Sequence, residues 1–358
     1  MTEAERQLGL TGMGNLYGRV PAKLPRGPLT GLWPAETEAP NDELTYADFM
    51  RKNGASEGAV ELLSVGFNAL MGDGPGTYSA LMMLYGDMFT NNHTVRLQIV
   101  DGNDKFPAAF ASKLGDRISY NSPVTSIGQD SDKVWVTVDN GGTQHQVTGD
   151  YLICTLPFTV LRDIPVSPAF TEEKQCAIRT LKYTSAVRIC LQFSDAFWLK
   201  EGLYGLAVTD LPMMIAYPQP NQAPPGGILN VLSTGASARQ LASLEESARL
   251  ETVLCQISEF FPQARALYVG GVTKDWDSDP YARGGYAYFE KGQVIPLTRA
   301  IELSERRICF AGDHASLLSG WMEGALNSGL RAAATVGSSA SGASQAGYLT
   351  PVNIHSIV

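Results

Sequence analysis

Residues 308–335, ICFAGDHASLLSGWMEGALNSGLRAAAT, are the stretch that decides the fold of this chain. The apolar run that ends at Phe310 predicts a buried strand, and the small residues after it predict a turn that carries Asp313. A helix is expected to begin near Trp321. The stretch therefore predicts a strand, a turn and a helix in direct succession.

The predicted helix carries small residues at a regular spacing. Gly324, Ser328 and Ala332 recur every four residues, so they share one face on which another segment can approach closely. Such units occur in α/β proteins for packing alone, and short motifs carry a risk of false matches. The other interpretation is a binding site, because a helix N-terminus offers free N–H groups and a positive dipole end to an anionic group.

The motif resembles the C-terminal FAD signature of the flavin-containing amine oxidase and L-amino acid oxidase family. That signature is Ala-Gly-Glu/Asp, a spacer, Gly-Trp/Tyr-Met-Glu-Gly-Ala and then Ser-Gly-x-Arg-Ala-Ala. The resemblance implies that Met322 and Glu323 offer backbone N–H groups to the flavin ring near N1 and the C2 carbonyl. It implies that the Gly312–Asp313 turn receives the ribityl hydroxyls, and that Trp321 forms one wall of the substrate cavity.

Further segments resemble the same family, in the right order, over nearly all of residues 40–336. They imply that the backbone of Val124 pairs with the adenine ring and that the strand leading to Thr155 passes beside the cofactor. They also imply that Tyr286 or Tyr288 stands opposite Trp321 as the second side of an aromatic cage, although ordinary core packing is an alternative for either tyrosine. The matching segments are 46–70, 101–107, 121–127, 151–157 and 275–286.

We therefore expect a mixed α/β fold, a partial FAD-binding amine-oxidase-like fold in which cofactor and substrate domains are interleaved. An irregular N-terminal arm rich in Gly and Pro is expected first, and a flexible Ser/Gly/Ala tail last. Hairpin strands are expected at 134–138 and 144–147, sheet strands at 186–193, 228–233 and 267–274, and one or two helices at 237–261. The expected division is 1–44 arm, 45–100 helical part of the substrate domain, 101–160 adenine side of the FAD domain, 161–300 substrate-domain sheet and helices, 301–336 FAD-domain strand-turn-helix, and 337–358 tail.

One family element is missing from the sequence, namely the G-x-G-x-x-G turn after a strand that cradles the pyrophosphate. The nearest candidate, Gly12-Met-Gly14 with Gly18, has the wrong spacing and follows a polar segment, so we expect a flexible loop there. Arg26 is not in the context of the family's carboxylate-clamping arginine. Three explanations stay open: a second chain supplies the segment, the protein has lost its need for flavin, or the sequence is truncated.

The resemblance implies oxidation of an amine, with hydride transfer to flavin N5 and formation of hydrogen peroxide. Arg188 stands where the family has a lysine that holds a water near N5. Arginine is permanently charged and a poor proton donor, so the exchange is not neutral. A slower oxidase, a dehydrogenase-like use of flavin and no redox reaction all remain open. His314 is expected to be a surface or hydrogen-bonding residue, and the alternative is that it faces the dimethylbenzene edge of the flavin or the substrate.

Composition limits the partners and the setting. A net charge of −9 without a basic patch argues against nucleic acid and anionic membranes. No apolar run reaches the ~20 residues of a membrane span and no signal peptide is evident, so we expect a cytoplasmic protein. The five cysteines are scattered and are expected to be reduced thiols, and no metal site is expected. No cysteine stands where some relatives attach flavin, so FAD is expected to be bound non-covalently.

The leading hypothesis is an FAD-dependent oxidase of a primary amine or an L-amino acid, completed by a second polypeptide or a homo-oligomer. The alternative is a flavin-free relative with a non-redox catalytic or ligand-binding role in specialised metabolism. Fold analogy does not separate the two, because function depends on the site.

Overall fold

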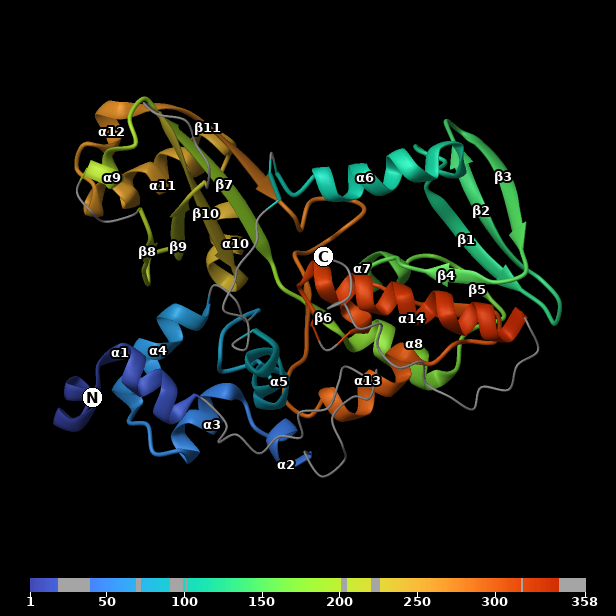
Figure 1. The fold of residues 1–358 in the computed structure, drawn as a ribbon, viewed down its shortest axis with the longest axis horizontal. Coiled ribbons are helices and arrows are strands. Elements are labelled where there is room, and N and C mark those ends of the chain that lie inside the picture. The colour runs from blue at the N-terminus through green and yellow to red at the C-terminus, as the bar shows by residue number, and fades with distance from the viewer. Residues whose placement is uncertain are drawn as a thin grey trace.

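The computed structural model describes residues 1–18, 39–68, 72–90, 99–100, 102–200, 205–219, 226–316 and 318–340. Three regions are visible in Figure 1: a group of N-terminal helices, a sheet covered by helices on one side, and a region of smaller sheets around the long helix α14 (Met322–Ala340). The chain passes between these regions more than once, as expected for interleaved domains.

The largest sheet has five antiparallel strands in the order β11-β7-β10-β9-β8. Val187, Ile189 and Leu191 alternate toward a core to which four helices contribute buried residues. The predicted strands are confirmed, and the predicted helical segment 237–261 forms two helices. The bounds are β7 (Ala186–Phe193), β8 (Ala207–Val208), β9 (Ile215–Pro218), β10 (Gly227–Thr234), β11 (Tyr268–Asp275), α10 (Gly235–Ala242), α11 (Glu246–Phe260), α12 (Ala264–Leu267) and, beside them, α9 (Phe197–Lys200).

A second sheet has the order β3-β2-β1-β5. The predicted hairpin is confirmed, and it turns through Gly141 and Gly142 at φ angles of 63° and 90°, which favour glycine. The bounds are β1 (Val124–Gln129), β2 (Val134–Asn140), β3 (Thr143–Gly149) and β5 (Val166–Ser167), and α6 (Lys105–Leu114) and η2 (Gly115–Arg117) precede them.

Two parallel strands, β4 (Leu152–Cys154) and β13 (Ile308–Phe310), pair in register from Ile308 with Leu152 to Phe310 with Cys154. All three β13 residues are buried. The predicted strand that ends at Phe310 and the helix that follows are therefore confirmed. Around them lie β6 (Lys182–Tyr183), β12 (Ala287–Tyr288), α7 (Phe158–Leu161), α8 (Glu172–Thr180), α13 (Val294–Glu302) and η3 (Asp313–Ala315).

Helix α14 buries Gly324, Ser328 and Ala332, the face predicted from their spacing. The Ser328 hydroxyl donates to the Gly312 carbonyl at 2.8 Å, which ties the helix to the turn after β13. The helix continues to Ala340, so the flexible tail predicted from residue 337 is wrong for its first residues. Residues 341–358 lie outside the described part.

The N-terminal arm is not irregular where the structure describes it, because Glu3–Tyr17 form helix α1. The loop predicted around Gly12 and Gly14 is therefore wrong, and Met13 and Tyr17 are buried against the neighbouring helices. These helices are α2 (Ala39–Asp42), α3 (Tyr46–Lys52), α4 (Glu57–Asn68) and α5 (Ala80–Thr90). Residues 19–38, with Arg26, lie outside the described part.

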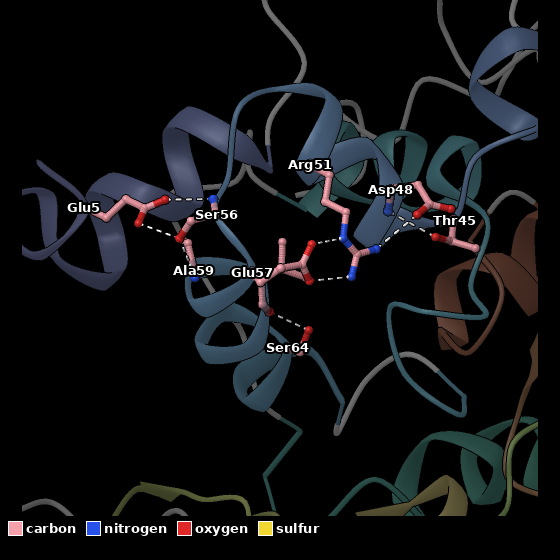
Figure 2. A network of polar contacts seen from close by, with 9 residues as sticks. Glu5, Thr45, Asp48, Arg51, Ser56, Glu57, Ala59 and Ser64 are labelled. Atoms are coloured by element: carbon pink, nitrogen blue, oxygen red, sulfur yellow. Dashed lines mark hydrogen bonds and ion pairs between the residues drawn. The ribbon is translucent and has the colours of Figure 1, made fainter. Parts of the chain in front are cut away.

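Figure 2 shows what holds α1 in place. The Glu5 carboxylate accepts the Ser56 N–H at 2.9 Å and the Ser56 hydroxyl at 2.7 Å, at the start of α4. These hydrogen bonds lower the pKa of Glu5 to about 2. A side chain from α1 thus stabilises the N-terminal end of another helix, where a negative charge is favourable.

Among the described helices, none has both the length and the apolar character that crossing a membrane requires.

Candidate active site

The carboxyl ends of β4 and β13 meet at one edge of the parallel pair, where ligands of α/β folds usually bind. Thr155 follows β4 and is exposed, and Gly312 and Asp313 follow β13. Gly312 has a φ of 136°, and a Cβ there would lie 2.5 Å from the His314 ring. Three of the residues predicted to bind a cofactor are therefore together, and the turn that holds them requires glycine.

The loop from Asp313 to α14 is fixed by the same carboxylate. Oδ2 of Asp313 accepts the Gly320 N–H at 2.9 Å. Gly320 has a φ of 81°, and a Cβ there would lie 3.3 Å from the Tyr286 ring. A Cβ on Gly324 would overlap the Leu318 carbonyl oxygen. The spacing of the two glycines around Trp321 thus follows from backbone conformation and close approach.

The start of α14 presents backbone donors. The N–H groups of Met322 and Glu323 have no backbone acceptor in the described part of the chain, as expected at a helix N-terminus. Trp321 is 56% exposed and Met322 51% exposed beside these donors. An aromatic side chain and free N–H groups at a long helix are suited to a planar ligand with negative charge at one edge.

Two buried polar atoms lie behind this loop. Nε2 of His314 and the hydroxyl of Tyr286 have no hydrogen-bond partner in the part described. The Gly72 backbone lies near the Tyr286 hydroxyl without forming a hydrogen bond of good geometry. The expected surface position of His314 is wrong: its ring is 2% exposed and lies 4.6 Å from the Phe158 ring. Burial lowers the pKa of His314 to about 4, so the imidazole is neutral at pH 7.

The tyrosines around the site have distinct positions. The Tyr286 ring lies against Gly320, the residue that precedes Trp321. Tyr288 instead stacks on Tyr78 at 6.0 Å, and burial raises its pKa to about 12. Tyr183 accepts the Phe158 N–H at 3.0 Å, and burial raises its pKa as well. Of the two candidate cage residues, Tyr286 lies at the loop that carries Trp321, and Tyr288 packs in the core.

Two predicted site residues lie on other sheets. Val124 is the first residue of β1 and pairs with Val138 just before a register irregularity. Arg188 is on β7, where its guanidinium lies 5.2 Å from the Tyr217 ring centroid. The structure thus groups seven of the nine predicted residues around the β13–α14 loop: Thr155, Tyr286, Gly312, Asp313, Trp321, Met322 and Glu323.

A lysine near this region is buried, although the sequence pattern does not indicate its burial. Lys174 of α8 is 1% exposed, and its ammonium lies 3.6 Å from the Phe310 ring centroid and donates to the Ile301 carbonyl at 2.8 Å. Burial lowers the pKa of Lys174 to about 7. The position looks solvent-facing in sequence because helix 172–180 is polar overall, and only the packing of α8 on α13 buries it.

The residues present fit the ring and ribityl end of FAD. The glycine turn, the Asp313 carboxylate and the free N–H groups of α14 are donors and acceptors that such a group would use. No glycine-rich strand-to-helix turn for a pyrophosphate occurs in the described residues. Nor do the described residues contain a group of three or more His, Cys, Asp or Glu side chains arranged for a metal ion.

Comparison with known proteins identifies the family. The profile for "Flavin containing amine oxidoreductase" matches residues 13–337. The chain belongs to this family. It is 32% identical over 289 residues to the "Putative L-amino-acid oxidase YobN" of Bacillus subtilis, which covers 78% of this chain and 59% of that protein. It is 28% identical over 305 residues to the L-amino-acid oxidase of Gloydius halys, which covers 82% of this chain and 60% of that protein.

Solved structures share the fold at low sequence identity. The chain matches cyclohexylamine oxidase from Brevibacterium oxydans with a TM-score of 0.77 at 20% identity, over 95% of this chain and 76% of that one. It matches putrescine oxidase bound to putrescine with a TM-score of 0.76 at 17% identity, over 94% and 76% of the two chains. This member of the amine oxidoreductase family thus spans about three fifths of the length of the curated relatives it matches.

Proposed function

We propose that this protein oxidises a primary amine or an L-amino acid to an imine with FAD, with hydride transfer to flavin N5 and formation of H2O2. The observation that carries the proposal is the β13–α14 loop. It presents an acid fixed by the Gly320 N–H, a half-exposed Trp321 and free N–H groups at the start of a long helix. Family membership supports the same chemistry.

In the proposed site, each residue binds or orients. Asp313 keeps one carboxylate oxygen for ribityl hydroxyls, because Gly320 occupies the other. The N–H groups of Met322 and Glu323 would stabilise negative charge at the ring edge. Trp321 and Tyr286 would orient the amine and exclude water. When bound, FAD supplies the acceptor for the hydride and passes the electrons to oxygen, so the protein need not carry the redox group itself.

We also propose that a second polypeptide supplies the pyrophosphate-binding segment. The sequence contains no G-x-G-x-x-G unit, and large apolar side chains are exposed at Trp321, just before α14, and at Met322 and Leu330 of α14. Helix α6 buries none of its side chains and leaves Phe110 48% exposed and Leu114 44% exposed. Apolar side chains that gather on a surface usually mark an interface. Assembly with copies of this chain is the alternative source of cover.

The test is a visible absorption spectrum of the protein purified from its own host, followed by denaturing separation of its chains. Flavin bands together with a second polypeptide carrying G-x-G-x-x-G are expected, and peroxide release is then assayed on amines and amino acids. A colourless single chain that takes up no added FAD would overturn both proposals. The search would then turn to non-redox ligands of the same site.

A further inference from the structure

Arg188 lies on the face of the five-stranded sheet that the helices do not cover. The third residue of β7, it is paired with Leu232 of β10 and Lys274 of β11. Its neighbours Val187 and Ile189 point into the helix-covered core. Val272, which shares the face of Arg188, is 65% exposed. A cation thus lies on the sheet face opposite the helix-covered core, beside both apolar and polar side chains.

The guanidinium of Arg188 is oriented but has no acceptor among the described residues. It lies 5.2 Å from the ring centroid of Tyr217, which belongs to β9, so the side chain extends across the intervening strand β10. Stacking on the ring holds the planar fork in one orientation. The side chain of Arg188 makes no hydrogen bond or ion pair with any residue of the described ranges.

Other arginines outside the exposed class differ in this respect. Arg249 donates to the Leu241 carbonyl at 2.9 Å, Arg307 to Ser131 at 2.7 Å and Arg331 to Ala315 at 2.9 Å. A partly buried guanidinium without acceptors is unfavourable, because its five donors lose water without replacement. Among these arginines, Arg188 is therefore the one whose N–H donors are open to an anion from outside the chain.

The surroundings of Arg188 leave its charge uncancelled. Lys274, its direct cross-strand neighbour, forms an ion pair with Asp279 at 2.6 Å, so its charge is already compensated. Asn230, 3% exposed on β10, accepts from the Cys190 thiol at 3.2 Å and donates to Gln219 at 2.9 Å. These amides are committed to each other. These hydrogen-bonded groups are neutral, so they do not compensate the charge of Arg188.

The segment that leads to Arg188 also positions the candidate active site. The Thr184 N–H donates to the Tyr286 carbonyl at 2.9 Å, and the Gly285 N–H donates to the Thr184 carbonyl at 2.8 Å. Strand β7 then runs from the centre of the molecule into the five-stranded sheet (Figure 1). Arg188, near the start of that strand, is therefore held at a fixed place relative to the tyrosine of the proposed cage.

We propose that Arg188, held by Tyr217, binds a carboxylate of the substrate, so that the protein acts on an amino acid in preference to a simple amine. This inference rests on the proposed function and deepens it. A guanidinium binds a carboxylate through two parallel N–H···O bonds, which a lysine does not reproduce. Arg188 then confers specificity on the substrate-domain side, independently of any arginine in a segment that another chain supplies.

The test compares amino acids with their decarboxylated amines on the purified protein together with whatever co-purifies. Phenylalanine is paired with phenethylamine and ornithine with putrescine, and dissociation constants are measured by calorimetry without turnover. Wild type is expected to bind each amino acid more tightly than its amine. Arg188→Met is expected to weaken amino-acid binding about 10- to 100-fold, as loss of a charge-assisted hydrogen-bond pair implies, and amine binding less than about 3-fold.

Three further variants sharpen the result. Lys274→Met removes a charge from the same face and is expected to change amino-acid binding less than about 3-fold, because Asp279 already compensates it. Arg188→Lys is expected to recover only part of the loss. Tyr217→Leu is expected to weaken amino-acid binding about 2- to 5-fold, the value of a cation–π contact at a partly exposed site.

The outcomes separate this inference from the proposed function. Equal weakening of amino acid and amine by Arg188→Met, or no preference in wild type, would overturn the carboxylate subsite even if peroxide is formed. Arg188-dependent amino-acid binding without flavin or peroxide would overturn the oxidase and keep the subsite. Thermal melting of each variant checks that the fold is intact, which is expected because the backbone pairing of Arg188 is kept and its described side-chain contact is the one with Tyr217.

Discussion

The five-stranded sheet and the parallel pair β4–β13 differ in how many partner strands each strand has and in how the faces are covered. Strand β7 has a paired neighbour on each side along nearly its whole length, and helices close one face over a separate core. Strand β13 is buried over all three residues, and β4 is its one partner strand in the described part, although Ile308 also forms an isolated bridge with Glu305. Parallel strands are normally found in larger sheets covered on both faces.

Following the proposed function, we call the five-stranded sheet with α9–α12 the substrate half, and the β4–β13 pair with α14 the cofactor half. The substrate half forms a complete five-stranded antiparallel sheet with a core of its own. The cofactor half relies on side-chain packing around β13 and on the α14 loop, so we expect it to gain more stability from a bound ligand or partner. The predictions below test whether the halves are separable and whether the cofactor half is the one that responds.

The largest effect is expected from truncating the core beneath β13. Phe310→Ala removes a ring that packs edge-on against Phe158 and Phe170 and lies under the Lys174 ammonium. The expected loss is about 3–5 kcal/mol in the free energy of unfolding. In hydrogen exchange, amides of β4, β13 and α14 should lose protection first.

The matched control for Phe310→Ala lies in the substrate half. Leu229→Ala truncates a fully buried side chain of β10 and is expected to cost about 2–5 kcal/mol. It should raise exchange in the five-stranded sheet and leave β13 protected. Uniform loss of protection throughout the chain in both variants would show one cooperative unit and remove the contrast between the halves.

The next effect concerns cofactor retention. Asp313→Ala removes the carboxylate at the end of β13 together with the bond to the Gly320 N–H. FAD affinity is expected to fall about 10- to 100-fold, the value of one or two hydrogen bonds to a charged group, with little change in the five-stranded sheet. Flavin released on gel filtration measures the loss. Asp150→Ala removes an exposed carboxylate paired with Lys133, and unchanged FAD retention is expected there; equal loss in both variants would argue against a specific role.

A smaller loss is expected from Gly324→Ala in α14. The added Cβ would overlap the Leu318 carbonyl, and overpacking of this kind typically costs about 1–3 kcal/mol. Gly329→Ala is the control on the same helix, because no atom lies within 4 Å of a Cβ there. That variant should gain stability from the better helix propensity of alanine. Urea unfolding of both variants measures the contrast, and a stabilised Gly324→Ala would mean that the loop is not held against the helix.

Much of this contrast was predictable from sequence because it depends on local patterns. The strand 186–193 was found from its apolar residues. The buried face of α14 followed from the spacing of Gly324, Ser328 and Ala332. Local order was enough in these cases because neighbouring residues determine both the element and its inward face.

Two of the failures share a cause, since each depends on contacts between distant segments. Helix α1 is stabilised through Glu5 by Ser56, far along the chain. His314 is buried because Gly312 turns the chain toward Phe158, which belongs to another segment. Neither partner is visible in the local pattern, so the loop and the surface histidine were reasonable expectations that tertiary packing overrode.

Lys174 offers the finest test, because it ties the cofactor half to pH. Burial lowers its pKa from 10.5 to about 7, so between these values the unfolded chain holds a proton that the folded protein has released. The free energy of unfolding should therefore rise with pH across this window, by at most about 1.4 kcal/mol per pH unit. Lys174→Met should be more stable than wild type near pH 6.5, and the difference should shrink as the pH approaches 9.

The control is Lys133→Met, which removes an exposed lysine paired with Asp150 and should keep the slope of wild type. Urea unfolding at pH 6.5, 7.5 and 9 gives the comparison, and identical slopes in wild type and Lys174→Met would show that the buried ammonium does not titrate in this range. Amide hydrogen exchange is followed over the same pH range. If protection rises with pH in β13 and α14 but not in the five-stranded sheet, the proton release lies in the cofactor half. The ammonium buried over the Phe310 ring lowers the stability of the cofactor half, which is a physical reason to expect this half to need a ligand or partner.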